Sequence, residues 1–361
     1  MTILPGATIG ILGGGQLGRM LALAAAPLGY RVHIYAPEGE LVAADVAAGC
    51  TCAAYEDRDA LAAFAAQCDV ITYEFENVPS DTVAFLEGLK PVRPGHEALD
   101  VAQDRLAEKR FVEALGGRTA PYRAVDTLDD LHAALADLGT PAILKTRRFG
   151  YDGKGQARIE RPADAAAAFA DLGGQGLILE GFVQFAAEFS VIVARGVDGR
   201  EAHYPVCLNR HEGGILARTE IPATSIADAD LEAATALVVA VADRLGYVGV
   251  LACEFFATAA GPVFNEMAPR VHNSGHWTIE GARTSQFEQH VRAVAGLPLG
   301  PVALTAPGFR MENLLGDTSD RWPALLANPT AHLHLYGKSE AVPGRKMGHV
   351  TFVMQTGLFK S

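Results

Sequence analysis

The sequence predicts an α/β protein that begins with a doubly wound parallel sheet and continues into regions of antiparallel strands. Over roughly residues 1–95, short apolar runs alternate with helical segments, which is typical of parallel strands joined by crossover helices. A glycine-rich turn follows the first apolar run and opens a helix, as it does in doubly wound sheets. Further on, two apolar runs separated by a short turn indicate an antiparallel hairpin at residues 248–264.

The N-terminal domain is expected to span residues 1–97. One expected helix follows the glycine-rich turn, and two more are expected at residues 61–67 and 83–89. The expected strands are residues 8–12, 31–35, 70–72 and 91–93.

A second domain is expected over residues 98–296, opened by an amphipathic helix at residues 104–115. A small unit at about residues 121–184 follows, and it carries a glycine-rich loop between two strands. The elements expected in this unit are strands at 142–145, 156–159 and 177–180 and a helix at 163–172. Residues 188–195 begin further antiparallel strands, and long helices are expected at 231–245 and 287–295.

Residues 297–361 are expected to form a small C-terminal β-rich domain of short strands and turns. The sequence shows neither an internal repeat nor a low-complexity linker, so we expect the three domains to pack against one another.

Composition and charge restrict the class of protein. The chain of 361 residues is 49% hydrophobic and 20% charged, which is globular, and no run of about 18 strongly apolar residues predicts a membrane span. A net charge of −12 argues against broad binding to nucleic acid or to an acidic membrane, so any anionic substrate must be held by local basic clusters. The N-terminus lacks the basic region of a signal peptide, and the expected location is the cytoplasm.

The five cysteines include no CxxC pair, so neither a disulfide scaffold nor a structural zinc site is expected. Cys50 and Cys52 are expected to pack as small hydrophobic residues.

Two glutamates in the predicted hairpin are the strongest indication of chemistry. If the hairpin pairs around Ala260, then Glu254 and Glu266 lie opposite each other on one face. Like charges in that position are destabilising, and in an apolar setting they need a raised pKa or a cation. Mg²⁺ prefers carboxylate and phosphate oxygens. The alternative is two solvated acids on an edge hairpin.

The first glycine-rich turn fits G-x-G-x-x-G through Gly13, Gly15 and Gly18. Backbone N–H groups at the start of the following helix would suit a phosphate. A dinucleotide site should also have an acid at the end of the second strand, but the nearest acid there is Glu38. Nicotinamide dinucleotide binding is therefore only weakly supported, and a tight turn or a phosphate-bearing substrate explains the glycines equally well.

A second glycine-rich loop lies between two expected strands and reads as a mobile flap. It carries Lys145, Arg147, Arg148 and Lys154, and its glycines allow close approach to phosphates. Two acids follow downstream, Glu180 at the end of a buried strand and Glu188. A second basic cluster lies near the C-terminus, at Lys338, Arg345 and Lys346, and alone it would be read as a solvated patch.

In their order along the chain, these features resemble the ATP-grasp superfamily. The shared features are the sheet domain, the helix with Arg105 and Lys109, Lys145, the flap, the 180–183 segment, Glu188, Glu254 and residues 265–266. Within that superfamily, the strings at 14–20, 73–79, 150–156, 268–278 and 344–349 resemble the 5-(carboxyamino)imidazole ribonucleotide synthetases. One departure is Lys154, where that family commonly has Arg, and Lys loses the bidentate geometry of Arg.

The resemblance implies an ATP-grasp fold behind a pre-ATP-grasp sheet domain, and it implies a reaction. ATP phosphorylates bicarbonate to carboxyphosphate, and the exocyclic amine of 5-aminoimidazole ribonucleotide then captures the carboxyl group, in purine (IMP) biosynthesis. Magnesium, or Mn²⁺ in its place, would neutralise the phosphates. The resemblance also implies a homodimer, coupled in function to the mutase that uses its product.

The resemblance assigns site residues as follows. The expected metal ligands are Glu254 and Glu266, assisted by Asn265. The expected nucleotide contacts are Arg105, Lys145, Gly150, Tyr151, Asp152, Gly153, Lys154, Gly155, Gln156, Glu180, Gly181, Phe182, Val183, Glu188, His211, Asn265 and Glu266. The expected catalytic residues are Arg270, His272, Tyr151, Asp152, Lys154 and Lys346. The expected ribonucleotide contacts are Gly15, Gln16, Leu17, Glu76, Asn77, Asn273, Ser274, Lys338, Arg345 and Lys346.

Three alternatives remain open at this point. A formate-activating ATP-grasp glycinamide ribonucleotide transformylase would share the fold and metal ligands but should differ in the 270–277 string and the C-terminal cations. An NAD-dependent oxidoreductase would use the N-terminal sheet, and the missing acid argues against it. Intact Glu254, Glu266 and Lys145 argue against a catalytically silent binding protein.

Overall fold

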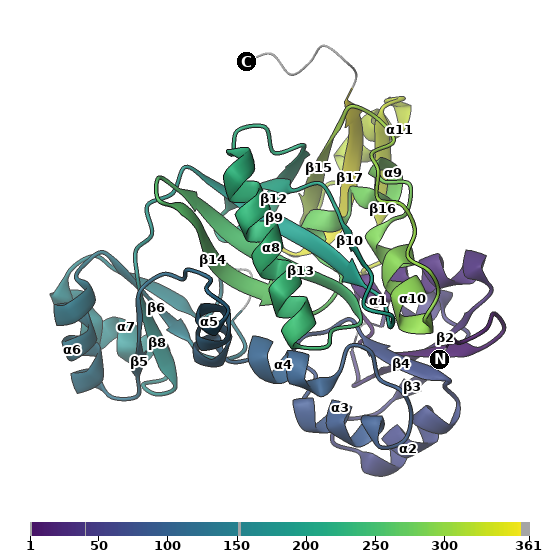
Figure 1. Ribbon diagram of the computed structural model, residues 1–361, viewed down its shortest axis with the longest axis horizontal. Helices are drawn as coiled ribbons and strands as arrows, with labels where there is room; N and C mark the ends of the chain where they lie inside the picture. Colours follow the sequence, from purple (N-terminus) through teal and green to yellow (C-terminus); the bar gives the residue numbers. More distant parts are fainter. Residues whose placement is uncertain (1, 40, 151–152, 355–361) are drawn as a thin grey trace.

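Three sheets make up the computed structural model, which describes residues 2–39, 41–150 and 153–354 (Figure 1). A parallel sheet of four strands is N-terminal, a four-stranded antiparallel sheet forms a small unit, and a nine-stranded sheet lies between them. The α/β fold class expected from the sequence is confirmed. Within the described residues no helix is both long and apolar enough to cross a membrane.

The N-terminal sheet has the order β3-β2-β1-β4 and is parallel throughout. Its strands are β1 (Thr8–Leu12), β2 (Arg31–Ala36), β3 (Gly49–Cys52) and β4 (Val70–Tyr73), and its helices are α1 (Gln16–Ala25), α2 (Arg58–Ala66) and α3 (Ser80–Glu87). The fourth expected strand is only a single parallel bridge between Val92 and Ile71.

Edge strand β3 was not expected from its sequence, because alternate residues are exposed and the apolar signal is weak. Cys50 and Cys52 lie on its exposed face, so the expectation that they pack as hydrophobic residues was wrong. All five cysteines are free thiols, as expected.

The small unit is an antiparallel sheet with the order β5-β8-β6-β7, covered by two helices. Its strands are β5 (Tyr122–Val125), β6 (Ala142–Thr146), β7 (Gln156–Ile159) and β8 (Leu177–Gly181), and its helices are α6 (Leu128–Leu138) and α7 (Ala165–Asp171). Leu131, Leu144 and Leu179 are fully buried in its separate core, which makes the unit a body of its own beside the central sheet.

The central sheet has the order β14-β13-β9-β11-β12-β15-β17-β16, with β10 paired to β9. Its strands are β9 (Ala187–Arg195), β10 (Glu201–His203), β11 (Cys207–Glu212), β12 (Ile215–Ile221), β13 (Gly249–Thr258), β14 (Gly261–Ala268), β15 (Gly308–Leu315), β16 (Ala331–Leu335) and β17 (Lys346–Met354). Because side chains alternate along a strand, β9 buries Val191 and Val193 in the core with α8 (Asp228–Arg244), and Ile192 in the core with α10 (Gln286–Ala295).

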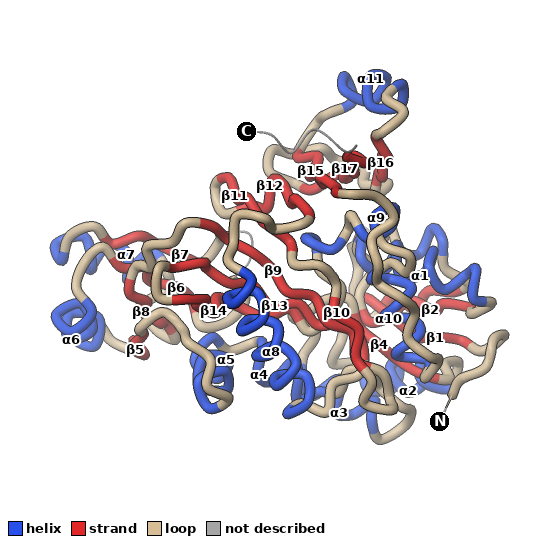
Figure 2. The backbone as a smooth tube through the Cα atoms, turned by 45° about the horizontal axis from the view of Figure 1, so that its top comes forward, coloured by secondary structure: helices blue, strands red, loops and turns tan. Residues whose placement is uncertain are grey.

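The C-terminal strands continue this sheet instead of forming one of their own, since β15 pairs with β12. Figure 2 shows β9 and β13 running from the small unit toward the N-terminal sheet. The remaining helices are α4 (His96–Ala102), α5 (Arg105–Ala114), α9 (Thr278–Gly281) and α11 (Trp322–Ala327). The expected domain limits stay a prediction.

Helix α10 joins the N-terminal sheet to the central one. The Thr72 hydroxyl lies 2.8 Å from Nε2 of His290, and Nδ1 of His290 accepts a 3.0 Å hydrogen bond from the Val250 amide. Arg93 also donates to the Val294 carbonyl at 2.6 Å. These hydrogen bonds hold the β4 edge of the parallel sheet against the central sheet.

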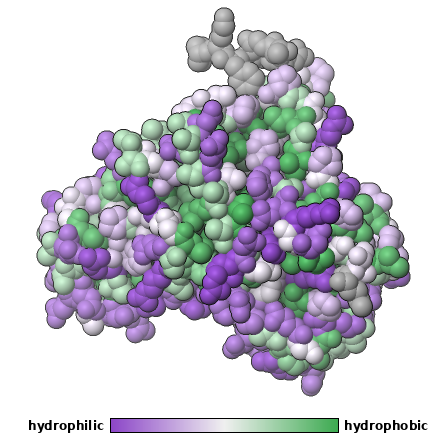
Figure 3. All heavy atoms as spheres, viewed as in Figure 1, coloured by the Kyte–Doolittle hydropathy of each residue, from purple (hydrophilic) through white to green (hydrophobic). Residues whose placement is uncertain are grey.

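Hydrophilic side chains cover much of the face seen in Figure 3, with apolar side chains between them. The excess of acids over bases is 12 in the whole chain, so clustered cations are the exception to be explained. The site described next contains several of them.

Candidate active site

The two glutamates of the hairpin face each other, as expected from the sequence. Glu254 on β13 is the register partner of Glu266 on β14. The pairs nearer the turn, up to Phe255 with Phe264, have a register that would match Glu254 with Asn265 if it continued. A β-bulge at this point makes Asn265 an extra residue of β14. The bulge therefore places the second carboxylate opposite the first.

The surroundings of the two carboxylates differ. Burial and the neighbouring Glu266 raise the pKa of Glu254 to about 7, and its side chain is only 14% exposed. Desolvation would also raise the pKa of Glu266, but Arg105 and Lys145 overcome it and hold that pKa below its usual value. Arg105 Nη1 lies 3.1 Å from Oε2 of Glu266. The pair therefore favours a bound cation at Glu254.

A buried triad of charges lies at the junction of α5 and the small sheet. Glu180 accepts from Lys145 Nζ at 2.8 Å and lies 3.1 Å from Lys109 Nζ. Burial alone would raise the pKa of Glu180, but the two lysines lower it to about 2. Burial lowers the pKa of Lys145 despite Glu180. An anionic ligand near Lys145 would share this cation with Glu180.

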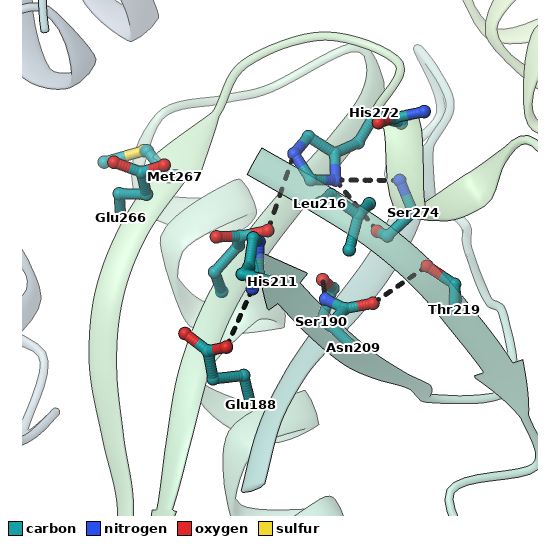
Figure 4. Close-up of polar contacts among 12 residues, drawn as sticks. Glu188, Ser190, Asn209, His211, Leu216, Thr219, Glu266, Met267, His272 and Ser274 are labelled. Carbon is teal, nitrogen blue, oxygen red and sulfur yellow. Dashed lines mark hydrogen bonds and ion pairs between the residues drawn. The ribbon is translucent and has the colours of Figure 1, made fainter. Parts of the chain in front are cut away.

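Glu188 and His211 form a second pair beside the glutamates. His211 Nδ1 lies 2.8 Å from Oε2 of Glu188 (Figure 4). Burial opposes protonation of His211, but Glu188 and Glu254 outweigh it and raise the pKa of this ring. Side chains of β9, β11, β13 and β14 thus converge on one face of the central sheet.

The described part of the flap approaches the turn between β11 and β12. A Cβ at Gly153 would lie 3.1 Å from the Gly213 carbonyl in the turn that follows His211, so a glycine is needed for this approach. Gly155 accepts from the Thr146 amide at 2.8 Å, which ties the flap to β6. Tyr151 and Asp152 lie outside the described residues.

Arg270 and His272 follow β14 and lie at the end of the acidic pair. Arg270 Nη2 is 2.7 Å from Oε2 of Glu76, a residue of the N-terminal domain. His272 Nε2 is 3.7 Å from Oε1 of Glu254, and its Nδ1 is 2.8 Å from Oγ of Ser274 (Figure 4). Desolvation and the nearby Arg270 hold the pKa of His272 well below its usual value, so the ring is neutral.

Comparison with known proteins identifies the family. Residues 6–103 match the ribonucleotide synthetase preATP-grasp domain, residues 110–287 the ATP-grasp domain, and residues 310–357 the phosphoribosylaminoimidazole carboxylase C-terminal domain. The N5-carboxyaminoimidazole ribonucleotide synthase of Brucella melitensis is 51% identical over 350 residues, which cover 96% of each chain. The chain belongs to the N5-carboxyaminoimidazole ribonucleotide synthase family.

Other relatives and solved structures agree. The synthase of Pseudomonas aeruginosa is 47% identical and matches 95% of this chain and 93% of its own. The crystal structure of the Thermus thermophilus synthetase superposes with a TM-score of 0.90 at 49% identity, covering 96% of this chain and 93% of that one. A synthase from Aspergillus clavatus, solved with ADP and 5-aminoimidazole ribonucleotide, has a TM-score of 0.90 at 30% identity, covering 97% and 94%.

This member of the family is therefore an ATP-dependent ligase that forms N5-carboxyaminoimidazole ribonucleotide in purine biosynthesis. The ATP-grasp fold expected from the sequence is confirmed. The roles expected for individual residues stay predictions, and the structure adds where each side chain lies.

In this synthase the first glycine-rich turn is occupied by a carboxylate of its own. The Gly15 amide donates to Oε1 of Glu74 at 2.7 Å, and a Cβ at Gly13 would lie 2.6 Å from the same oxygen. Burial raises the pKa of Glu74, although the Gly15 amide opposes this. Because this carboxylate already accepts from the Gly15 amide, any phosphate at this turn, of a dinucleotide or of the ribonucleotide, would have to displace it or bind the other amides at the start of α1. Gln16 and Leu17 begin the helix beside it.

Two of the three C-terminal cations act on carboxylates of the site. Lys346, the first residue of β17, acts electrostatically on both Glu254 and His272. Lys338 Nζ donates to the Lys346 carbonyl at 2.8 Å and acts on Glu74. Arg345 donates to the Glu340 carbonyl at 3.0 Å. The fold thus brings a cluster that is remote in sequence to the expected ribonucleotide end.

The segment expected to contact adenine begins at the end of β8. The Gly181 amide donates to the Pro121 carbonyl at 2.8 Å, and Phe182 is 44% exposed with the Arg158 guanidinium 4.6 Å from its ring centre. Val183 follows Phe182 in the same connection, outside any helix or strand. An exposed ring here is available for contact with an apolar ligand face.

Two expected ribonucleotide contacts are engaged within the protein. Asn273 exchanges amide hydrogen bonds of 2.9 and 2.7 Å with Asn313 on β15, and Ser274 is fully buried against His272. Both side chains therefore support the loop that carries Arg270 and His272. Asn77 lies next to Glu76 and is half-buried.

The structure also adds residues that the sequence did not single out. Glu108 is buried, accepts from the Met267 amide at 2.6 Å, and has its pKa raised to about 8, chiefly by burial. Its position three residues after Arg105, one helical turn away, was the available signal. Gln286 holds the backbone of His272 at both of its polar groups, and no local pattern marks it.

Proposed function

We propose that this enzyme uses bicarbonate as the carboxyl source and ATP as the activator, through carboxyphosphate. A bicarbonate oxygen attacks the γ-phosphorus of ATP and ADP leaves. The exocyclic amine of 5-aminoimidazole ribonucleotide then bonds to the carboxyl carbon, phosphate leaves, and the nitrogen loses a proton. The relatives' names support the product, and one of the solved relatives contains ADP and the ribonucleotide.

The observation that carries the bicarbonate assignment is the position of His272 and Arg270 at the end of the Glu254–Glu266 pair. His272 lies 3.7 Å from Glu254, and Arg270 is the next basic group along the same loop. A small oxyanion between them would meet a cation and a neutral imidazole donor at once. Such a site suits bicarbonate and the carboxyphosphate made from it.

We propose Glu254 and Glu266, with Asn265 beside them, as the residues that hold magnesium. The side chain of Glu254 is 14% exposed, and burial together with the neighbouring Glu266 raises its pKa, which a bound divalent cation would relieve. Within the described residues no third histidine, cysteine or acid completes such a group, so nucleotide phosphate oxygens would supply the remaining ligands. Bound magnesium would neutralise charge on the phosphates during transfer.

The protein's own groups would do the rest. Arg105 and Lys145 would neutralise the phosphates, and the flap at residues 150–156 would exclude water from carboxyphosphate. Glu188 would accept from the ribose of ATP, and the 180–183 segment would contact adenine. Lys338, Arg345, Lys346 and the start of α1 would receive the ribonucleotide phosphate, and Glu76 and Asn77 its ribose or base.

The decisive assay measures ADP release with each substrate omitted in turn. We expect release that needs Mg²⁺ and bicarbonate and that rises when 5-aminoimidazole ribonucleotide is added. Release stimulated by formate and glycinamide ribonucleotide, with no dependence on bicarbonate, would overturn the proposal in favour of the transformylase. Mn²⁺ should replace Mg²⁺ in the same assay.

We also propose a homodimer that works in the cytoplasm and hands its product to the mutase that uses it. Five free thiols support a reducing compartment, and family membership supports the rest. Sedimentation equilibrium tests the homodimer, since the chain mass is 38.1 kDa and a mass equal to that of one chain would contradict it.

A further inference from the structure

A buried glutamine outside the Glu254–Glu266 pair holds the backbone of His272. Gln286 is the first residue of α10 and is fully buried. Its Oε1 accepts from the His272 amide at 3.0 Å, and its Nε2 donates to the His272 carbonyl at 2.6 Å. One side-chain amide thus satisfies both backbone groups of a residue that has left strand β14, as a neighbouring strand would.

The ring of His272 is fixed from the other side. The Ser274 amide donates to Nδ1 at 3.3 Å, and the Ser274 hydroxyl lies 2.8 Å from the same atom. Because a backbone N–H can only donate, Nδ1 is the acceptor and Nε2 carries the proton. Nε2 is the atom that lies 3.7 Å from Oε1 of Glu254. Backbone and ring together therefore direct one N–H at the centre of the site.

The packing around Gln286 leaves it little freedom. A Cβ at Gly275 would lie 2.5 Å from Oε1 of Gln286, so only glycine fits there. The backbone amide of Gln286 donates to the Thr278 hydroxyl at 2.9 Å, and its side-chain Nε2 also lies 3.3 Å from Nδ1 of His276. The first residue of α10 is thus in contact with several residues of the segment that follows His272.

We propose that Gln286 is a positioning residue that keeps His272 aimed at the carboxyl group being transferred, an inference that rests on the proposed function. Nucleotide contacts lie on other elements, so ATP binding does not depend on this glutamine. When the 270–273 loop is released, carboxyphosphate still forms, but it is poorly placed for the amine and is lost to water. The signature of its loss is extra ADP released per molecule of product.

The chain offers a matched control on the same helix. Gln289 is also fully buried, and its side-chain amide exchanges two 2.8 Å hydrogen bonds with the backbone of Gly300, which is not part of the loop that carries His272. Gln286→Met and Gln289→Met therefore remove the same kind of buried backbone contact with similar side-chain volume. Only the first of them releases His272.

The experiment compares the two variants with the wild type in kcat, KM for ATP, the ratio of ADP to product, calorimetric binding of Mg·ATP, and Tm. For Gln286→Met we expect kcat to fall about 100-fold, as for an approximately 1 Å misplacement, with a raised ADP-to-product ratio and unchanged Mg·ATP binding. For Gln289→Met we expect a similar loss of Tm but a wild-type ratio. Equal ratios in the two variants, or a wild-type ratio in Gln286→Met, would overturn the inference.

Two further variants decide the matter if Gln286→Met does not fold. Gln286→Glu keeps an acceptor for the His272 amide but loses the donor to its carbonyl, so its ratio should lie between those of the wild type and Gln286→Met. Gly275→Ala adds a methyl group that displaces Oε1 of Gln286, so it should raise the ratio of ADP to product while residue 286 remains glutamine. Unchanged ratios in Gln286→Glu and Gly275→Ala would also refute the positioning role of Gln286. ADP release by the wild type that does not depend on bicarbonate would instead refute the proposed function.

Discussion

Glu254 on β13 and Glu266 on β14 lie opposite each other because Asn265 is an extra residue in the second strand. Without the bulge, Glu254 would lie opposite the side-chain amide of Asn265, and the two carboxylates would not face each other. The pair is costly to the fold: the pKa of Glu254 rises to about 7 through burial and Glu266. A feature that lowers stability and gathers charge in one place is expected of a functional site.

Replacing Glu254 by Gln should therefore stabilise the fold while it stops turnover. A raised folded-state pKa means that stability is lost as pH rises from the usual value toward about 7. At pH 8 without metal, we expect Glu254→Gln to gain on the order of 1–3 kcal/mol of unfolding free energy. Urea denaturation at pH 5 and pH 8 measures this, with Asp243→Asn as an exposed control. Lower stability than wild type at pH 8 would contradict it.

The buried triad predicts the opposite result at Glu180. Removing this carboxylate leaves Lys145 and Lys109 facing each other without an anion, because both lie against Glu180. We expect Glu180→Gln to cost about 3–5 kcal/mol of unfolding free energy. Adding Lys109→Met should recover part of the loss, since one buried charge is then removed.

The matched surface control for this prediction is Asp137→Asn. Asp137 pairs with Arg123 and is 51% exposed, so its loss should cost at most about 0.5 kcal/mol. Equal losses for Glu180→Gln and Asp137→Asn in the same denaturation series would show that the triad is not a stability element.

His290 predicts sensitivity to acid. Burial lowers its pKa to about 4, so the folded chain keeps this ring neutral between Thr72 and Val250. Above pH 6.5, His290 is neutral in both the folded and the unfolded chain, so it adds nothing to the pH dependence of the unfolding free energy. As pH falls from 6.5 toward 4, this histidine takes up a proton in the unfolded chain but not in the folded one, and the unfolding free energy decreases. The loss from this group should reach about 3 kcal/mol.

His290→Gln should flatten the curve of unfolding free energy against pH over that interval, because glutamine can accept and donate at the same places without titrating. His203→Gln, which changes an exposed histidine on β10, is the comparison. Identical slopes for wild type and His290→Gln would mean that other buried histidines account for the acid sensitivity.

Lys346→Ala should mainly raise the KM for the ribonucleotide. Its charge acts on Glu254 and His272, and it is not among the main charges that act on Arg105 or Lys145. We expect roughly a tenfold rise or more in that KM, as for loss of a charge-assisted contact of about 1.5–3 kcal/mol, with the KM for ATP little changed. Arg321→Ala, another partly exposed cation, is the control. An unchanged ribonucleotide KM would make the cluster a solvated patch.

Local patterns were sufficient for much of the fold. Alternating apolar runs located β1, β2 and β4, and the short turn located the β13–β14 hairpin with its two acids in the right pairing. The half-exposed strand β3 and the short strand β5 carry little periodic signal, and neither was found. The joining of β15 to β12 depends on contacts between residues about 90 positions apart, which no local pattern encodes.

The sequence by itself determined which residue types were present for ATP chemistry and, by resemblance, which family they belong to. It also predicted that Glu254 faces Glu266, although the pairing set by the turn itself would match Glu254 with Asn265. Only the tertiary structure decided how the bulge achieves that pairing, that Glu74 fills the glycine turn, that two lysines share Glu180, and that Gln286 holds His272. These contacts join distant segments, and their energy depends on burial and direction, which exist only once the chain is packed.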